Sequence, residues 1–297
     1  MNKYLIFRTD RIGDFLLTAI LIKSIKRNDP NSIINIVASI KNYNYIKKFK
    51  EVDNVILFNK GILNKLKLII LLKKDIYRAI IIHDAKKRSS FLSFFLKSDL
   101  KIYPNRNSNI SYFSDIQNIL NNLNFNFDKN DLNTLNNRSY NELKDLKNNY
   151  ILFHFDEKWI HKEYISNYIN IEPTENELIS FLSLITNKTN KDLVVTTGLK
   201  TPIILDKIFI NKFHSKITFL KNLDFLEVES LIDKSDLLIS CHGAVSHVSA
   251  AKNIKQIDII EESKSDFYKK WTDHFRNYNF IYRKNFNDLS KDIINLL

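Results

Sequence analysis

An acidic residue beside a scarce glycine is the first feature of the sequence that could do chemistry. The stretch RTDRIGDFLLT, residues 8–18, follows the apolar run Tyr4–Phe7 and places Asp14 directly after Gly13. The chain has only 4 glycines, so a glycine here indicates a position at which a side chain would not fit. Asp14 could act as a general base or could cap the helix that begins there, and the residues alone leave both roles open. The spacing matches neither the GxGxxG fingerprint nor a Walker loop.

Two later clusters also stand where apolar runs end. The first is HFDEKW at residues 154–159, in which Lys158 could meet a phosphate. A surface lysine beside a core-packing tryptophan is the plainer interpretation of the same residues. The second is VVTTG, which brings the hydroxyl of Thr197 next to Gly198. Both clusters indicate strand ends at which polar groups collect.

A fourth cluster, LISCHGAVSHVSAA at residues 238–251, ends a strand and enters a helix of small residues. Backbone N–H groups at that helix N-terminus would bind a diphosphate well. His242 and His247 flank the turn, but two histidines without a further clustered ligand make a zinc site a weak interpretation. Cys241 follows a strand and would be buried, so a nucleophilic role for its thiol is an equally weak interpretation. We therefore expect no metal site.

The elements that must position these groups alternate between strands and helices in both halves of the chain. In the first part, strands are predicted at 4–7, 33–37, 55–58, 79–82 and 101–103, and helices at 15–26, 43–49, 63–72 and 91–97. Residues 105–149 show a weaker pattern, with a helix near 116–123 and a linker. Further strands are predicted at 150–153, 193–196, 217–220, 237–240 and 256–260, and helices at 177–185, 225–232 and 289–297.

This alternation predicts an α/β protein with two domains. Short β-branched runs separated by helical patterns indicate parallel sheets covered on both faces. The length of 297 residues suits two domains, which we place at 1–145 and 146–297. Two doubly wound domains would put a cleft between the carboxyl ends of their sheets. The last helix could pack back on the first domain.

Composition narrows the class of protein. No apolar run is long enough for a transmembrane helix, and the first residues suit a strand better than a signal peptide. One cysteine excludes an internal disulfide, so we expect a cytoplasmic protein. The net charge of +12 would draw the chain to phosphates on nucleotides, nucleic acid or an anionic membrane. The lysines are scattered and no nucleic-acid motif occurs, so we expect no nucleic-acid partner.

Taken together, the clusters resemble the signatures of the ADP-heptose:lipopolysaccharide heptosyltransferases, glycosyltransferase family 9. RTDRIGDFLLT resembles the family's Arg-x-Asp-x-Ile-Gly-Asp motif at the end of a first strand. HFDEKW resembles its His-containing strand end followed by Lys and Trp, and VVTTG its strand ending in a hydroxyl and glycine. LISCHGAVSHVSAA resembles its Asp-Thr-Gly-x-x-His-x-x-Ala-Ala motif. The resemblance spans nearly the whole chain, apart from the region around 105–145.

The resemblance implies a GT-B fold, in which two Rossmann-like domains face a central cleft, with the acceptor bound by the first and the donor mainly by the second. It implies an inverting, metal-independent transfer of a sugar from a nucleotide diphosphate, by family default heptose from ADP-heptose. The acceptor would be a lipopolysaccharide core or a related lipid-linked glycan of the cell envelope. No cofactor is implied beyond the nucleotide-sugar donor. The enzyme would work in the cytoplasm, with peripheral contact at the inner membrane as an option.

Family roles can be carried over to matching residues. Asp14 would be the general base that takes the proton of the acceptor hydroxyl. Lys158 would meet the donor diphosphate. The other donor-side residues would be Thr197 and Gly198 near the nucleoside, and His242, Gly243, Ala244 and His247 in a phosphate-facing turn. The acceptor-side residues would be Arg11, Gly13, Lys87 and Arg88, although a solvated helix start is the plainer interpretation of Lys87 and Arg88.

Two departures from the family pattern keep other functions open. The family has Asp where this chain has His242, and Thr-Gly where it has Gly243 and Ala244. An imidazole in place of a carboxylate leaves the identity of the sugar open. The alternatives are a GT-B enzyme with another donor, a nucleotide-sugar epimerase, a family member that binds its ligand without turnover, and a basic nucleotide- or nucleic-acid-binding protein.

Overall fold

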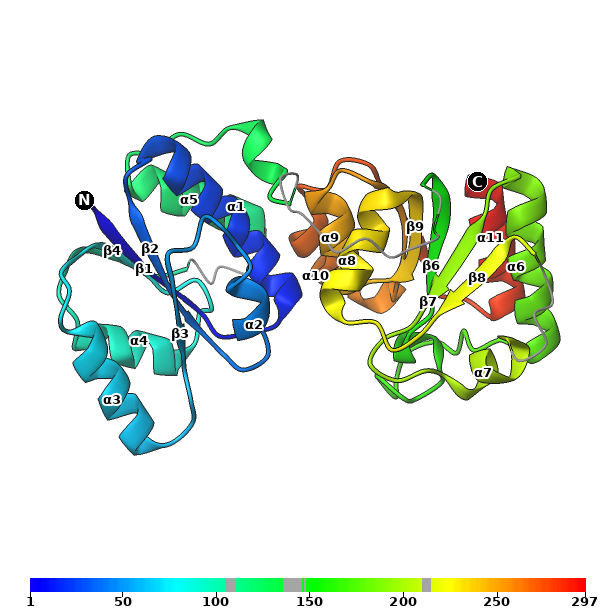
Figure 1. Ribbon diagram of the computed structural model, residues 1–297, viewed down its shortest axis with the longest axis horizontal. Coiled ribbons are helices and arrows are strands. Elements are labelled where there is room, and N and C mark those ends of the chain that lie inside the picture. Colours follow the sequence, from blue (N-terminus) through cyan, green and yellow to red (C-terminus); the bar gives the residue numbers. More distant parts are fainter. Residues whose placement is uncertain (105–109, 136–145, 147, 210–214) are drawn as a thin grey trace. The chain divides into compact units, whose positions relative to one another are not determined.

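The computed structural model describes residues 1–104, 110–135, 146, 148–209 and 215–297. The chain divides into two compact units, each built on one sheet (Figure 1). Unit 1 comprises Met1–Thr134 together with Lys269–His274, and unit 2 comprises Leu135–Tyr268 together with Phe275–Leu297. The boundary predicted at 145/146 borders residues 136–145, which lie outside the described part of the chain.

Unit 1 holds a parallel sheet of five strands in the order β3-β2-β1-β4-β5. Its elements in chain order are β1 (Lys3–Arg8), α1 (Ile12–Asn28), β2 (Ile33–Ala38), α2 (Tyr43–Ile46), β3 (Asn54–Leu57), α3 (Ile62–Leu72), β4 (Tyr77–Ile81), α4 (Lys87–Phe94), β5 (Ser98–Ile102), α5 (Tyr112–Asn122) and a 3-10 helix (Lys129–Leu132).

The core of unit 1 forms where the central strands meet helices on both faces. The run Tyr4–Phe7 of β1 is fully buried, as expected for a strand with neighbours on both sides. On one face, leucines of α3 and α4 pack against β1 and β4 in one apolar cluster. On the other face, α1 packs against α5. The first strand is therefore held rigidly from both sides, and so is the loop at its end.

Unit 2 holds a parallel sheet of six strands in the order β11-β10-β9-β6-β7-β8. Its elements are β6 (Tyr150–His154), a 3-10 helix (Glu157–Trp159), α6 (Glu175–Thr189), β7 (Leu193–Thr196), α7 (Ile203–Phe209), β8 (Ile217–Leu220), α8 (Phe225–Lys234), β9 (Ser235–Cys241), α9 (Ala244–Ala251), β10 (Lys255–Ile260), a 3-10 helix (Glu262–Lys264), α10 (Ser265–Thr272), β11 (Tyr278–Tyr282) and α11 (Phe286–Leu296). The boundary between the units falls within α10, whose residues from Lys269 on belong to unit 1.

Aromatic side chains dominate the core of unit 2. Phe153 on β6 contacts Phe155, Trp159 and Phe181, with ring centroids 5.0 to 5.8 Å apart. The indole N–H of Trp159 donates to the carbonyl oxygen of His154 at 3.0 Å, so the polar atom of this buried ring is satisfied. These contacts fix the path of the chain just after β6, where Lys158 lies.

The two sheets share one topology. In each unit the first strand lies in the middle, and the direction in which strands are added reverses beside it, between β1 and β4 in unit 1 and between β6 and β9 in unit 2. Doubly wound sheets bind ligands outside the carboxyl ends of the strands at this reversal. The sequence clusters at residues 8–18, 154–159 and 238–251 all fall at these two places, as do Lys87 and Arg88, which follow β4.

The prediction of two doubly wound parallel α/β domains is confirmed, while several details differ. In the final helix, Phe286, Leu289 and Ile293 of α11 belong to the apolar core of unit 2, and its packing on the first domain stays a prediction. The helix expected over 43–49 ends at Ile46 and continues as two turns. Helices α7 and α10 and strand β11 were not predicted. No described helix is both long and apolar enough to cross a bilayer.

Candidate active site

At the reversal point of unit 1, the ends of β1 and β4 meet in a buried polar network. Arg8 donates from Nε to the hydroxyl of Thr18 at 2.6 Å, and that hydroxyl lies 2.9 Å from Nδ1 of His83. Thr9 donates from its hydroxyl to Asp84 at 2.5 Å. Burial, followed by the charge of Arg8, holds the pKa of His83 well below its ordinary value, so this ring is neutral near pH 7. The network positions the loop that leads into α1, whose first turn carries Asp14.

Charged side chains around this loop are paired with one another. Asp10 forms ion pairs with Arg8, at 3.2 Å, and with Lys86. Lys86 also donates to the carbonyl oxygen of Thr9 at 3.0 Å. Arg88 donates to the hydroxyl of Thr9 at 2.8 Å and stacks over the ring of Phe58 at 5.1 Å. The basic residues of this edge are therefore used largely to hold the loop.

Asp14 stands apart from that network. It lies in the first turn of α1, is half-buried, and accepts a hydrogen bond from the backbone N–H of Arg11 at 3.0 Å through Oδ2. This contact is the capping role that the sequence left open. Only one carboxylate oxygen is used in it, so capping and proton transfer are compatible in one side chain.

The other residues assigned to the acceptor side divide into two pairs. Arg11 is the exposed N-cap residue of α1, and Gly13 is buried in the first turn of that helix. The backbone makes no separate turn at Gly13, because α1 already begins at Ile12. Lys87 is exposed as the first residue of α4, whereas Arg88 is held by Thr9 and Phe58. Lys87 is therefore the more accessible cation of the two.

At the reversal point of unit 2, a lysine and a buried aspartate form an ion pair. Lys158 contacts the carboxylate of Asp156, which also lies 3.7 Å from Nε2 of His154. Burial alone would raise the pKa of Asp156, but the charge of Lys158, the nearby His154 ring and the hydrogen bonds from Lys158 together outweigh burial, and the pKa is lowered. Burial likewise opposes the charge of Lys158, yet Asp156 raises the lysine pKa. Both groups therefore stay charged near neutral pH.

His154 is neutral although it lies beside that ion pair. Burial lowers its pKa to about 4, and the nearby Asp156 carboxylate opposes the shift only in part. Nδ1 of the ring lies 2.9 Å from the hydroxyl of Thr196 on the next strand. The ring therefore braces the ends of β6 and β7.

The ammonium of Lys158 lies at the N-terminus of α9. A Cβ built on Gly243, the N-cap residue, would lie 2.9 Å from Nζ of Lys158. The absence of a side chain at Gly243 therefore lets this cation reach the start of the helix. Backbone N–H groups and the helix dipole already make that end positive. Two positive features at one point favour the binding of an anion there, where it would share the Lys158 ammonium with the carboxylate of Asp156.

His242 is oriented from behind by a buried carboxylate that the sequence analysis did not single out. Asp258 on β10 is fully buried and lies 2.6 Å from Nδ1 of His242. Asp258 also accepts from the hydroxyls of Ser246, at 2.8 Å, and Tyr278, at 3.1 Å. A single aspartate within the apolar strand QIDII was the available signal, because a buried carboxylate must have partners.

The remaining donor-side residues lie around this centre. Thr197 is buried after β7, and a Cβ on Gly198 would lie 2.6 Å from Oε2 of Glu157, next to Lys158 in the sequence. Ala244 is the first residue of α9. His247 is buried, and its ring packs edge-to-face on that of His242 with centroids 5.5 Å apart. His247 therefore supports the turn from within the helix.

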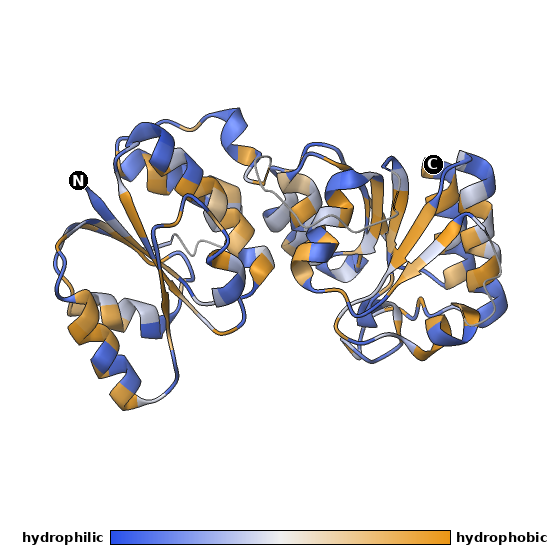
Figure 2. Cartoon of the chain, viewed as in Figure 1, coloured by the Kyte–Doolittle hydropathy of each residue, from blue (hydrophilic) through white to orange (hydrophobic). Residues whose placement is uncertain are grey.

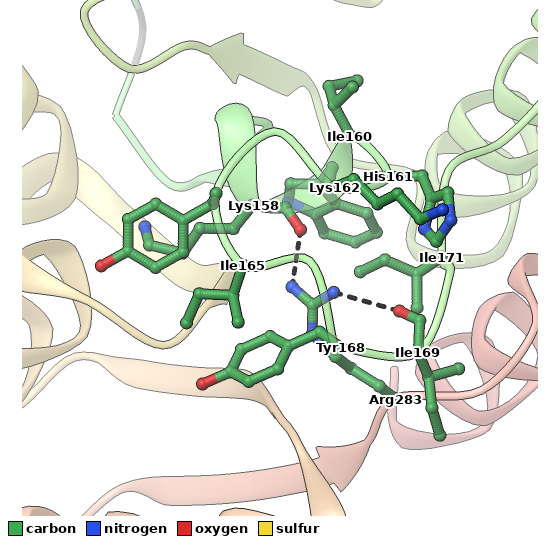
Figure 3. Close-up of a pocket in the computed structure, with 11 residues that line it drawn as sticks. Lys158, Ile160, His161, Lys162, Ile165, Tyr168, Ile169, Ile171 and Arg283 are labelled. Atoms are coloured by element: carbon green, nitrogen blue, oxygen red, sulfur yellow. Dashed lines mark hydrogen bonds between the residues drawn. The ribbon is translucent and has the colours of Figure 1, made fainter.

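Arg283 is a second residue that the sequence analysis missed. It follows β11, is buried, and donates to the carbonyl oxygens of Lys158 at 2.6 Å and Ile169 at 3.3 Å (Figure 3). Its guanidinium also stacks on the ring of Tyr168 at 5.1 Å. Arg283 thereby ties the segment after Lys158 to the edge of the sheet. No motif surrounds it, and only the pairing of β11 with β10 brings it there.

Cys241 and the histidines do not form a reactive or metal-binding group among the described residues. Burial raises the pKa of the Cys241 thiol to about 12, so it stays protonated at neutral pH. Within the described ranges, no three His, Cys, Asp or Glu side chains cluster closely enough to hold a metal ion. The expectation of a metal-free reaction stays a prediction.

Comparisons of sequence and of structure gave different results. The sequence matches no protein-family model and no curated protein. The structure is similar to that of the E. coli heptosyltransferase WaaC with ADP-2-deoxy-2-fluoro heptose, at a TM-score of 0.69 and 12% identity, covering 99% of this chain and 100% of that one. It is also similar to that of a glycosyl transferase family 9 protein from Veillonella parvula, at a TM-score of 0.70 and 12% identity, covering 98% of this chain and 90% of that one.

A third similarity is to a UDP-GlcNAc 2-epimerase from Methanocaldococcus jannaschii, at a TM-score of 0.56 and 11% identity, covering 100% of this chain and 92% of that one. All three likenesses extend over nearly the whole length of both chains. At identities this low they establish the architecture. The chain has the GT-B fold of these heptosyltransferases, with two Rossmann-like units.

Proposed function

We propose that the protein is an inverting glycosyltransferase of the heptosyltransferase type. Its donor would be a nucleoside diphosphate sugar, by family default ADP-heptose, and its acceptor a lipopolysaccharide core or a related envelope glycan. The transfer would need no metal and would take place at the cytoplasmic face of the inner membrane. Three features support this proposal: the residue signatures, the GT-B fold, and the cationic site at α9.

The observation that carries the proposal is the ammonium of Lys158 at the N-cap of α9. A leaving nucleoside diphosphate gains negative charge as the glycosidic bond breaks. An ammonium and a helix N-terminus held in place beforehand stabilise such charge without reorganising during the reaction. His242, oriented by Asp258, adds a ring that can donate or accept a hydrogen bond at the same point.

Proton removal is assigned to Asp14. The acceptor hydroxyl oxygen would form its bond to the anomeric carbon as the bond to the diphosphate oxygen breaks on the opposite side, which inverts the configuration. Asp14 would take the hydroxyl proton, and the diphosphate would leave with the electron pair of the broken bond. A carboxylate is a weak base at neutral pH, so proton transfer would occur late, when the hydroxyl has become acidic.

Thermal stabilisation by ligands tests the donor assignment. The intact chain is melted with ADP-, UDP-, GDP- and CMP-sugars and with free nucleoside diphosphates, without added metal. We expect a clear rise in melting temperature with one class, and with ADP-heptose if the family default holds. A rise with another nucleotide sugar would replace the donor and keep the mechanism. The absence of any rise would contradict the proposal.

Epimerisation is a second candidate, favoured by the similarity in fold to a UDP-GlcNAc 2-epimerase. An epimerase needs no acceptor, whereas a transferase leaves the sugar attached to one. Incubation of the donor alone, followed by chromatography of the sugar, separates the two functions. A new nucleotide-sugar isomer without acceptor would identify an epimerase, and an unchanged donor would favour transfer.

A further inference from the structure

Six large apolar side chains of α3 and α4 are open to solvent. We call them the apolar patch: Ile62 (76% exposed), Leu63 (74%), Leu66 (51%), Ile70 (64%), Phe91 (59%) and Phe94 (77%). Figure 2 shows hydrophobic colouring along α3 and on α4, in the lower left of the view. A patch of this kind on a soluble domain marks an interaction surface.

The patch on α3 is a second apolar stripe. Only Leu68 and Leu72 of this helix are buried, and they face the core of unit 1. Ile62, Leu66 and Ile70 follow one another at intervals of four residues, so they share a face that points away from those leucines. A helix that covers a sheet needs one apolar stripe and normally carries polar residues opposite it. The second stripe on α3 has no function in the fold of unit 1.

Helix α4 continues the surface. Leu92 and Leu96 pack in the same core cluster as Leu68 and Leu72, which holds the two helices together. The rings of Phe91 and Phe94 each pack on Phe95, at 5.1 and 5.6 Å. The exposed phenylalanines of α4 therefore form one aromatic cluster with Phe95, and Nζ of Lys73, directly after α3, lies over the Phe95 ring at 6.0 Å.

Lysines surround the apolar patch. The segment 54–74 contains no acidic residue and five lysines: Lys60, Lys65, Lys67, Lys73 and Lys74. None of them forms an ion pair with the part of the chain that the structure describes. Lysine stems can lie along apolar surface while the ammonium reaches outward to a headgroup.

We propose that α3 and α4 form a docking surface for a membrane that contains anionic lipids. Aliphatic and phenylalanine side chains would enter the headgroup–acyl boundary, and the lysines would meet lipid phosphates. Helix α3 has 11 residues and is about 16 Å long, which is half of what spanning a bilayer requires. It would therefore lie in the interface. This inference does not depend on the proposed sugar transfer.

Charge distinguishes a lipid surface from other occupants. A second copy docked on the same face would bring together the ten lysines of two 54–74 segments, neither of which contains an acidic residue, and like charges oppose that contact. Nucleic acid would match the lysines but leave the aliphatic side chains without partners. Only an anionic apolar interface satisfies both features at once.

Flotation of the full chain with lipid vesicles tests the proposal. We expect the protein to float with vesicles of phosphatidylcholine and phosphatidylglycerol, and much less with phosphatidylcholine alone or at high salt. Leu63→Glu/Ile70→Glu should reduce the partition coefficient at least tenfold. Lys65→Gln/Lys67→Gln/Lys73→Gln should reduce it by about fivefold for each lysine.

Matched controls keep the test decisive. Leu184→Glu/Ile203→Glu removes equally exposed apolar side chains from unit 2, and Lys48→Gln/Lys255→Gln/Lys264→Gln removes exposed lysines elsewhere. Both controls should float like the unaltered chain. Failure of the unaltered chain to float, or equal flotation of patch and control variants, would overturn the proposal. So would dimerisation without lipid that Leu63→Glu/Ile70→Glu abolishes, because the occupant would then be a second copy.

Discussion

The first turns of two helices, α1 in unit 1 and α9 in unit 2, meet side chains of opposite charge. In α1 the carboxylate of Asp14 accepts the N–H of Arg11 and complements the positive end of the helix. In α9 the ammonium of Lys158 lies beside the N-cap Gly243 and adds to that positive end. The first helix end meets a carboxylate of the chain, whereas the second meets an ammonium that contacts the buried Asp156 and can also take an anion from outside the chain. The same strand topology therefore presents a carboxylate at the helix start in unit 1 and an ammonium at the helix start in unit 2.

The two reversal points also share a structural device. In unit 1 the buried ring of His83 lies 2.9 Å from the hydroxyl of Thr18, and in unit 2 that of His154 lies 2.9 Å from the hydroxyl of Thr196. Burial lowers the pKa of both histidines. In each unit a neutral imidazole forms a hydrogen bond with a threonine hydroxyl. This bond joins the end of β4 to α1 in unit 1 and the ends of β6 and β7 in unit 2. The units therefore agree in their scaffold and differ in the charge that they present.

The proposed function gives Asp14 a role as general base besides the capping contact with Arg11, and substitution separates the two roles. Asp14→Asn keeps an oxygen for the Arg11 N–H and removes the basic group. We expect the transfer rate to fall between about a hundredfold and ten-thousandfold, with unchanged donor affinity. Steady-state kinetics and calorimetric titration with the donor measure these quantities.

The matched control is Glu177→Gln, because Glu177 accepts the backbone N–H of Thr174 in the same position of α6. It should lose as little stability as Asp14→Asn and should keep full activity. Loss of donor binding and melting temperature in Asp14→Asn would leave Asp14 with the capping role alone.

The shared histidine device predicts loss of stability on acidification. The folded-state pKa of His154, about 4, lies below its ordinary value of 6.5. The unfolded chain therefore takes up a proton as the pH falls through 6.5, whereas the folded chain does not until about pH 4. The stabilisation is complete above pH 6.5 and is lost toward pH 4, by up to about 3 kcal/mol for this residue.

Urea unfolding at several pH values between 7 and 4 measures the slope with which the free energy of unfolding falls as the pH is lowered. His154→Asn keeps an amide near the Nδ1 position and cannot take up the proton, so it should flatten the slope for unit 2. His83→Asn should do the same for unit 1, since its pKa is shifted in the same direction. An unchanged slope in both variants would assign the acid sensitivity to other groups.

Neutralising the cation at α9 should weaken anion binding. Lys158→Met alone leaves Asp156 buried without its partner, which costs about 3–5 kcal/mol of stability. The double variant Asp156→Asn/Lys158→Met avoids that penalty. We expect it to bind a nucleoside diphosphate about tenfold to a hundredfold more weakly, as measured by calorimetry.

Lys252 and Asp233 offer a control pair in the same unit, joined by a contact of 2.7 Å with the lysine buried. Asp233→Asn/Lys252→Met should leave nucleoside diphosphate affinity unchanged. Equal losses of affinity in the two double variants would mean that Lys158 acts through the fold and not through the ligand.

The smallest expected effect concerns the acceptor side. Lys87→Gln should raise the apparent KM for the acceptor by a few fold at low salt, with unchanged melting temperature, because Lys87 is exposed. Arg88→Gln should lower the melting temperature instead, since it loses its contacts with Thr9 and Phe58. An acceptor KM that neither variant changes would remove this edge from acceptor binding.

The sequence determined the architecture because the pattern is local. Apolar runs such as Tyr4–Phe7 and Tyr150–Phe153 are each too short to be anything but buried strands once helical periodicity resumes after them. Alternation of the two periods requires parallel strands and crossover helices, and polar residues directly after a strand must then gather at one edge. Lys158 and Gly243 could be placed at that edge for this reason.

Only the tertiary structure decided which of those polar groups are already paired. Asp258 lies in an ordinary strand sequence, and Arg283 follows β11, an edge strand that periodicity did not reveal. Their bonds to His242 and to the Lys158 segment join residues separated by 16 and 125 positions. Such contacts depend on strand order, which a linear pattern does not encode. For the same reason the spacing of α3 predicted a helix, but only its packing revealed that the helix carries a second apolar face.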